Sequence, residues 1–274
     1  MTEREASTGR RWFEALSGTN GERSGTPGSL LIADATLGDE RVTYIAVAPD
    51  PDARFMRARH AELGLEEGWF GAKYLTDLIK ADRNGIKRPI ITVVDSKSQA
   101  YGRREELAGI YLAAAALIAA FAEARLEGHP VIALIVGRAV SGSFLELCGQ
   151  ANEIIAFNSP DVIVHAMYKE AAARITRRSV AELDKLGEKI VPLAYDIGSF
   201  AKLGALYKLL DVANPSEPAD ATVQQVKTVL LEAIASARSG PRDLSRRLQS
   251  EGAQNLRQAS LIVREKMAQQ WAES

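Results

Sequence analysis

The residues best suited to chemistry lie in a short turn rich in glycine and serine. Ser141, Gly142 and Ser143 follow an apolar run at 132–136 that predicts a buried strand, and the apolar residues at 144–147 predict a helix start. The first backbone N–H groups of a helix lack partners within it and attract anions. This turn could therefore stabilise an oxygen that becomes negative during a reaction. The alternative is a packed turn that needs glycine only for clearance.

A second polar loop follows another predicted strand. The β-branched run at 89–95 ends in Asp95, and Ser98, Gln99 and Tyr101 come next. Active sites of parallel sheets lie at the carboxyl ends of the strands, so we expect the two loops to meet. Ser98 and Gln99 are further candidate donors, and Gln99, Tyr101 or a water could deliver a proton. Asp95 is expected to anchor a loop by accepting backbone N–H groups.

Three arginines near these loops are candidate contacts for an anion. Arg103 and Arg104 could attract an acidic protein or a phosphate group, although a solvated loop explains them equally well. Arg138 lies inside the glycine-rich turn, which suits a structural or a carboxylate-contacting role. His60 and His129 show no metal-binding spacing, so no metal site is expected.

Composition narrows the class of protein. A net charge of −1 over 274 residues gives no support for a nucleic-acid surface. The single cysteine, Cys148, cannot form an internal disulfide and lies among apolar residues, which predicts a core position and fits a cytoplasmic location. No apolar run reaches the roughly 20 residues of a membrane span. The first residues lack the apolar centre of an export signal.

The remaining elements follow from hydropathy and turn residues. We expect a mobile N-terminal segment at 1–28, a main domain at 29–240, and a C-terminal helix at 241–274 that could contact a partner chain. The strands expected within the domain are 30–37, 41–48, 89–95, 131–137, 153–158 and 161–166. The helices expected are 69–85, 105–126, 178–187, 200–211 and 221–236.

Three segments, in this order, carry a family resemblance. They are GWFGAKYLTDLIKADRNGIKRPIITVVDS (68–96), VIALIVGRAVSGSFLEL (131–147) and DIGSFAKLGALYKLLD (196–211). Together they resemble the alpha subunit of bacterial acetyl-CoA carboxylase carboxyltransferase. The loop 96–102 departs from that family's proline-glycine loop, and Gly142-Ser143 departs from its glycine pair. These departures, with the short chain, resemble the gamma subunit of biotin-independent malonate decarboxylase.

The resemblance implies a crotonase-like α/β fold, a spiral of ββα units, with extra helices at the C-terminus. It implies an active site shared with a homologous beta subunit, where a malonyl thioester on an acyl carrier protein loses carbon dioxide and becomes an acetyl thioester. The carrier's prosthetic group would be of the dephospho-coenzyme-A type, and an acyl-carrier transferase, the alpha subunit, would complete the complex. Neither biotin, a metal nor a directly bound cofactor is implied.

Within that frame, the backbone N–H groups of Gly142 and Ser143 are the first candidates for an oxyanion hole. One preorganised donor lowers a barrier by roughly 3–4 kcal/mol. Ser141 could hydrogen-bond the carboxylate, or only fill the turn. The hole could face the enolate oxygen or orient the departing carboxylate, and the sequence leaves both open.

Three other hypotheses stay open. The first is a carboxyltransferase subunit of a biotin-dependent acyl-CoA carboxylase. The second is a serine hydrolase, because the turn also resembles that of the caseinolytic serine peptidases; Ser141 and His165 would then act with Asp95, Asp161 or Asp196. The third is a structural subunit whose helix at 105–126 and C-terminal helix form an interface while the beta chain performs all the chemistry.

Overall fold

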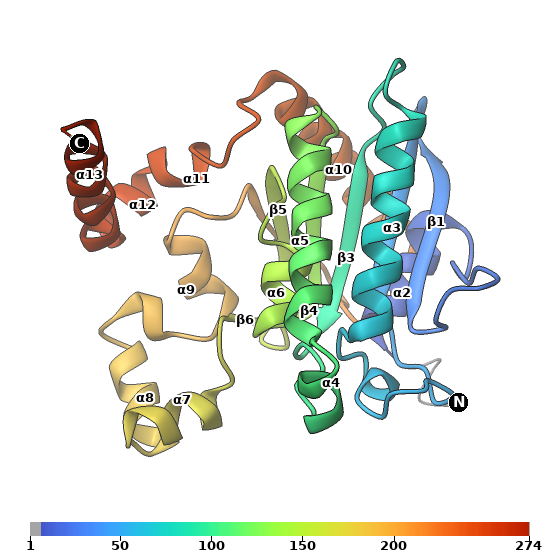
Figure 1. Cartoon of the computed structure of the whole chain (residues 1–274). Coiled ribbons are helices and arrows are strands. Elements are labelled where there is room, and N and C mark those ends of the chain that lie inside the picture. The colour runs from blue at the N-terminus through green and yellow to red at the C-terminus, as the bar shows by residue number, and fades with distance from the viewer. Residues whose placement is uncertain (1–6, 274) are drawn as a thin grey trace.

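The computed structural model describes residues 7–273, and among these a sheet of seven strands forms the centre (Figure 1). Expectations for residues 1–6 lie outside the described part. The strands follow the order β1-β2-β3-β4-β5-β7, and β6 pairs with β4. Among the strands described, β1 and β2 pair antiparallel, and the other strand pairs are parallel. The bounds are β1 Leu30–Leu37, β2 Glu40–Val47, β3 Ile90–Ser96, β4 Val131–Val140, β5 Glu153–Phe157, β6 Ile163–His165 and β7 Lys208–Leu210.

Helices cover both faces of the sheet. In Figure 1, α3 and α5 lie side by side in front of the strands, and α2 and α10 lie behind them. The smaller helices α7 to α9 and α11 to α13 gather beyond one edge. The bounds are α2 Thr8–Ser17, α3 Leu65–Ala81, α4 Arg103–Leu107, α5 Ile110–Leu126, α6 Gly142–Leu147, α7 Lys169–Thr176, α8 Val180–Gly187, α9 Ile197–Lys202, α10 Asp220–Ser239, α11 Arg246–Gln249, α12 Glu251–Leu256 and α13 Gln258–Ala272, with 3-10 turns at Ala58–His60 and Val191–Leu193.

The central strands are buried on both faces because helices cover both sides, as is typical of parallel sheets. Residues 90–94 of β3 and all five residues of β5 are buried, and they are mostly Ile, Val, Ala and Thr. This is why short apolar runs, rather than alternating patterns, marked these strands in the sequence.

A break in register places the two predicted loops together. β3 and β4 pair up to Val94 and Ile135, and the register then jumps to Ser96 and Ala139. On its other side, β4 pairs with β5 over residues 132–135 and with β6 over residues 138–140. The loop after β3 and the turn after β4 therefore begin at the same edge of the sheet, as the sequence predicted.

The N-terminal segment differs from our expectation. Residues 8–17 form α2, and Trp12, Phe13 and Leu16 are buried in the core instead of belonging to a mobile segment. Ser7 caps this helix by accepting the N–H of Arg10. An amphipathic pattern with a serine cap is a helix signal that the flanking Gly, Ser and Thr residues obscured.

Three helix predictions also need correction. The segment 200–211 holds only the end of α9 and then β7, which forms because β5 offers an open edge. The single C-terminal helix is instead three, α11 to α13. The long helix at 105–126 is divided into α4 and α5 by Gly109, whose φ of 82° is left-handed.

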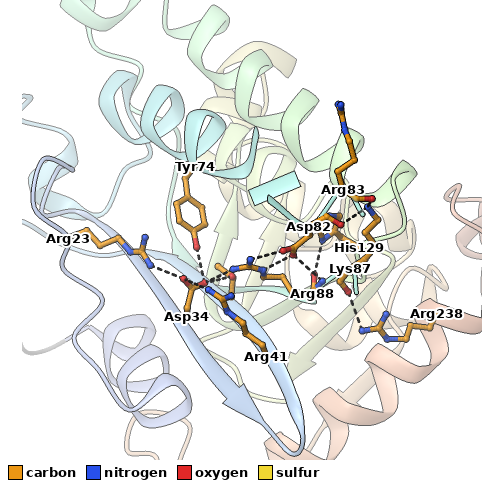
Figure 2. A network of polar contacts seen from close by, with 11 residues as sticks. Arg23, Asp34, Arg41, Tyr74, Asp82, Arg83, Lys87, Arg88, His129 and Arg238 are labelled. Carbon is orange, nitrogen blue, oxygen red and sulfur yellow. Dashed lines mark hydrogen bonds and ion pairs between the residues drawn. The ribbon is translucent and has the colours of Figure 1, made fainter. Parts of the chain in front are cut away.

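A polar network braces the opposite end of the sheet (Figure 2). The guanidinium of Arg88 donates two hydrogen bonds to Asp82, at 2.6 and 2.7 Å, and a longer one to Asp34. The hydroxyl of Tyr74 also donates to Asp34, at 2.9 Å. Burial alone would raise the pKa of Asp82, but Arg88 holds it below its usual value. Because Arg88 precedes β3, this network lies away from the two loops and is structural.

Replacing Trp12 with alanine should destabilise the fold by about 3–5 kcal/mol. Trp12 is fully buried, its indole N–H donates to the carbonyl of Pro215 at 2.7 Å, and its ring meets Phe157 edge-on at 4.7 Å. Urea denaturation measures the loss. Trp69→Ala, at a position 50% exposed, is the matched control and should cost less than about 1 kcal/mol. Equal losses in the two variants would show that α2 is not part of the core.

Candidate active site

The two loops meet at the side chain of Gln99. Its Oε1 accepts a hydrogen bond from the Ser141 hydroxyl, at 2.8 Å, and another from the Gly142 N–H, at 2.6 Å. We call these two donors the cradle. An amide oxygen carries partial negative charge, so Gln99 fills the cradle as an oxygen of a substrate would. The predicted donors Ser141 and Gly142 are thus brought together with Gln99.

The backbone of the cradle is strained. Ser141 has φ 64° and ψ −145°, a conformation that residues with a Cβ rarely adopt. Its N–H donates to the carbonyl of His165 at 2.8 Å, which helps to hold the turn. A Cβ on Gly142 would lie 2.6 Å from Gln99 Oε1, so only glycine leaves room for an oxygen there. Ser143 is the third residue of the turn, and its hydroxyl donates to the Val140 carbonyl at 2.8 Å.

Asp95 anchors this region, as the sequence predicted. Its Oδ2 accepts the N–H of Gly9 at 3.0 Å, and its Oδ1 accepts the N–H of Arg138 at 3.1 Å. A Cβ on Gly137 would overlap the Asp95 carboxylate, so this glycine provides clearance. The carboxylate therefore ties α2 and β4 to the end of β3.

The loop after β3 is held by the segment before α3. The N–H of Leu63 donates to the Ser98 carbonyl at 3.1 Å, and the N–H of Ala100 donates to the Leu63 carbonyl at 2.7 Å. Gln99 lies between these two bonds, so its backbone is fixed while its side chain reaches the cradle. Ser98 is buried and is not among the residues that line the cavity at the cradle, so its predicted role as a donor gains no support.

A cavity of about 490 Å³ opens beside the cradle. Charged side chains from several elements line it, and Lys97 lies 3.6 Å from Glu62. Glu62 also pairs with Arg57 at 2.8 Å, and that guanidinium lies 4.3 Å from the centre of the Tyr101 ring. The lining residues are Glu62, Lys97, Gln99, Tyr101, Ser141, Met167, Tyr168, Glu170, Ala171 and Arg174.

The predicted arginines differ in their relation to this cavity. Arg103 and Arg104 are exposed at the start of α4 and do not line it. Arg138 is exposed too, but its charge acts on Tyr168, which does line the cavity. Burial raises the pKa of Tyr168, and Arg138 partly offsets that rise. Among the three, Arg138 is the one placed to influence the site.

The residues of the serine-hydrolase hypothesis are not assembled. The Ser141 hydroxyl donates to Gln99, whereas His165 Nδ1 lies 2.9 Å from the carbonyl of Met167, and its ring stacks on Tyr195. Asp95 is occupied by backbone N–H groups, and Asp196 caps α9 by accepting the N–H of Ser199. Within residues 7–273, no hydrogen bond joins the Ser141 hydroxyl to the His165 imidazole, or that imidazole to a carboxylate.

Residues 7–273 provide neither a metal site nor a reactive thiol. No group of three or more His, Cys, Asp or Glu side chains could hold a metal ion. Cys148 is buried as predicted, and burial raises the pKa of its thiol to about 12. None of the helices described has the length and apolar character to cross a membrane.

Several residues of the cavity were missed in the sequence. Lys97 lies in the predicted loop but received no predicted role, and Glu62, Tyr168 and Arg174 lie in segments without a motif. Only the folded chain brings them to the cradle. Lys97, beside Ser98 and Gln99, is the one that its position could have revealed.

Comparison with known proteins shows the family of this chain. The profile of the malonate decarboxylase gamma subunit matches residues 58–271. The chain belongs to this family. A Pseudomonas malonate decarboxylase hetero-tetramer in complex with coenzyme A contains a chain 49% identical to this one, covering 97% of this chain and 100% of that chain, with a TM-score of 0.92. A Pseudomonas MdcD–MdcE hetero-dimer gives 48% identity, the same coverage and a TM-score of 0.88.

Two relatives are more distant. The malonyl-S-ACP:biotin-protein carboxyltransferase MADD of Malonomonas rubra is 33% identical over 190 residues, which are 68% of this chain and 65% of that protein. This chain thus spans less than two thirds of that relative's length. Transcarboxylase 12S is 20% identical, with 78% of this chain and 37% of that chain covered and a TM-score of 0.58, and it shares the fold alone.

These findings confirm the family and the crotonase-like α/β fold with extra C-terminal helices. In this member of the gamma-subunit family, Ser141 and Gly142 form the cradle and Asp95 anchors the region around it.

Asp95→Ala should cost this gamma subunit about 3 kcal/mol of stability, because two backbone N–H groups lose a charged acceptor. It should also displace the turn that carries Ser141. Thermal or urea unfolding measures the first effect. Asp161→Ala, in the exposed turn before β6, is the control and should cost less than about 0.5 kcal/mol. A stable Asp95→Ala variant would contradict the anchoring role.

Proposed function

We propose that this chain, with a homologous beta subunit, decarboxylates a malonyl thioester to an acetyl thioester and carbon dioxide. The observation that carries the proposal is the cradle of Ser141 and Gly142, which already holds an oxygen in a chain of this family. The acyl group would be carried on an acyl carrier protein through a prosthetic group of the dephospho-coenzyme-A type. An acyl-carrier transferase, the alpha subunit, would serve the same carrier, and biotin would not be used.

The chemistry decides which oxygen suits the cradle. As the bond to the carboxylate breaks, its electrons move into the thioester, so negative charge leaves the carboxylate and gathers on the enolate oxygen. A strong cation on the carboxylate would stabilise the reactant more than the transition state. The cradle offers a neutral hydroxyl and a neutral N–H, which can orient a carboxylate without removing its charge. We therefore assign the malonyl carboxylate to the cradle and the enolate oxygen to donors of the beta subunit.

The cavity supplies the remaining functions. Lys97 is matched by Glu62, so its charge is partly neutralised, and Arg174 can attract an anionic substrate. Tyr101 lines the same cavity and carries a hydroxyl, so we assign it the delivery of a proton to the enolate carbon. Arg103 and Arg104, being exposed, suit contact with the acidic carrier protein.

The surface next to the cavity suits a partner subunit. Leu107, Tyr111 and Leu112 expose 81%, 66% and 51% of their surface, and they follow Tyr101 along α4 and α5. Large exposed apolar groups close together mark protein interfaces. A beta subunit on this side would close the cavity against water and complete the site. The chain alone should then be inactive.

A second candidate is carboxyl transfer to a biotin protein. The 33% identity to the carboxyltransferase of Malonomonas rubra over 190 residues is the observation that favours it. The same cradle could then hold an oxygen of the biotin ring.

For the proposed function, one prediction separates the two candidates. Purified gamma and beta subunits, given a malonyl-carrier protein without biotin, should release carbon dioxide, whereas either subunit alone should not. Labelled carbon dioxide is trapped and counted. No release, together with transfer of the labelled carboxyl group to a biotin carrier protein once that protein is added, would establish the second candidate and overturn the first.

A second prediction tests the cradle. Ser141→Ala removes one hydrogen bond to a charged oxygen and should lower kcat/KM about 10- to 100-fold, mostly through KM. Gly142→Val fills the cradle and should lower kcat/KM at least about 100-fold. Both variants should still bind the beta subunit in size-exclusion chromatography.

The control is His165→Gln, which should keep kcat/KM within about twofold because the imidazole contacts Met167 and Tyr195 rather than Ser141. Full loss with His165→Gln would revive the hydrolase hypothesis. Normal turnover with Gly142→Val in an intact complex would make this chain a structural subunit.

A further inference from the structure

Two buried glutamates lie on α3 and α6, and the second of these helices begins at the cradle. Glu67 of α3 and Glu146 of α6 each expose only 1% of their surface. Glu67 accepts hydrogen bonds from the Ser29 hydroxyl and from the N–H of Gly64. For Glu146, neither carboxyl oxygen has a hydrogen-bond partner in the part of the chain that the structure describes. An ionised carboxylate buried without a partner is very costly, so this difference assigns the proton to Glu146. Burial raises the pKa of Glu67 too, but the Ser29 and Gly64 donors oppose that rise and favour its charged form.

Glu146 belongs to the same short helix as the cradle. α6 begins at Gly142, whose N–H is one of the two donors, and Glu146 lies about one turn later. The buried residues of this helix are Ser143, Glu146 and Leu147, and the helix packs against α5, β3 and β4. Anything that forces the Glu146 side chain toward water must therefore move the helix that starts at the cradle.

The groups around this helix do not neutralise a charge on Glu146. The buried face of α5 is apolar except for Arg125 near its end, which binds Gln150 and the Arg242 carbonyl. From β3, Thr92 donates to the Leu147 carbonyl, and Asp95 is held by backbone N–H groups.

The other neighbouring elements complete this picture. Arg138 of β4 is exposed, and Glu105 of α4 is buried beside Gly102. Glu67 of α3 is the charged group that acts on Glu146. Burial, reinforced by that charge, raises the pKa of Glu146 to about 8.

We propose that Glu146 is a positioning residue that holds α6 and the Gly142 N–H in place only as a neutral acid, so that losing its proton switches the cradle off at alkaline pH. As a neutral carboxyl, Glu146 fills its buried position at little electrostatic cost. As a carboxylate beside Glu67, it is repelled and must reach water, which pulls α6 away from α5. The proposal rests on the proposed function only where activity is its readout.

The pH dependence of turnover tests the proposal. In the gamma–beta complex, kcat of the wild type at pH 9 should be about tenfold below its value at pH 7, following ionisation of Glu146. Glu146→Gln keeps the shape but cannot ionise, so its kcat should stay within about twofold of its neutral value over this range. Glu67→Gln removes the neighbouring charge, eases ionisation of Glu146 and should move the alkaline fall to lower pH.

The matched control is Glu123→Gln, which removes an exposed glutamate of α5. Its pH profile should match that of the wild type. The same alkaline fall in wild type and Glu146→Gln would overturn the proposal. No turnover by the wild-type complex at any pH would instead count against the proposed function, which keeps the two failures distinct.

Two measurements on the chain alone need no activity. Infrared spectra at pH 7 should show the carbonyl stretch of a protonated carboxylic acid, and that band should be absent in Glu146→Gln. Because the folded pKa lies above the unfolded value of about 4.3, the wild type loses stability as pH rises from there to about 8. The denaturation midpoint of Glu146→Gln should therefore gain on that of the wild type across this interval. No band and no such gain would overturn the proposal even if the variant complexes were inactive.

Discussion

The carboxylate of Asp95 fixes the place where the two parallel strands of the site separate. β3 and β4 run together in register up to Val94, and the pairing then breaks. At that point Asp95 accepts one N–H from α2 and one from the continuing strand β4. The N–H of the buried Gly9 would otherwise lack a partner, at a cost of about 1–3 kcal/mol. The break is therefore held open by a charged acceptor, and it leaves room for a loop on one side and a turn on the other.

The cradle depends on this gap, and Gln99 Oε1 accepts a hydrogen bond from each of its two donors. Ser141 is held at a positive φ, and the Gly142 N–H begins a helix, so both donors need an acceptor. When a substrate enters, its oxygen takes the place of Gln99 Oε1, so the two cradle donors keep the same number of hydrogen bonds. What favours the substrate is the stronger bond that a charged oxygen accepts. Selectivity for an anion thus follows from the exchange, without a cation in direct contact.

The sequence predicted those parts of the site that are local. The turn at 141–143 and the loop at 98–101 each follow an apolar, β-branched run, and parallel pairing brings their ends together. It could not predict Arg174 or Glu62, because no local pattern marks a residue that reaches the site through tertiary packing. β7 was assigned to a helix because its apolar spacing fits one, and only the open edge of β5 makes it a strand. α2 was missed although Ser7, Trp12 and Phe13 carried a helix signal.

Glu146 shows how a departure from ordinary packing can belong to a site. A leucine at this position would fit the apolar surroundings and cost no desolvation. At a pH where the unfolded chain ionises Glu146 and the folded chain keeps it protonated, the acid lowers the stability of the fold. Glu67, by contrast, has a structural role, because it caps α3 and accepts a hydrogen bond from Ser29. A polar residue that breaks the rules of the core without a structural gain is expected at functional positions. Its distance of about one helical turn from Gly142 gives the acid a mechanical connection to the cradle, which a surface glutamate would lack.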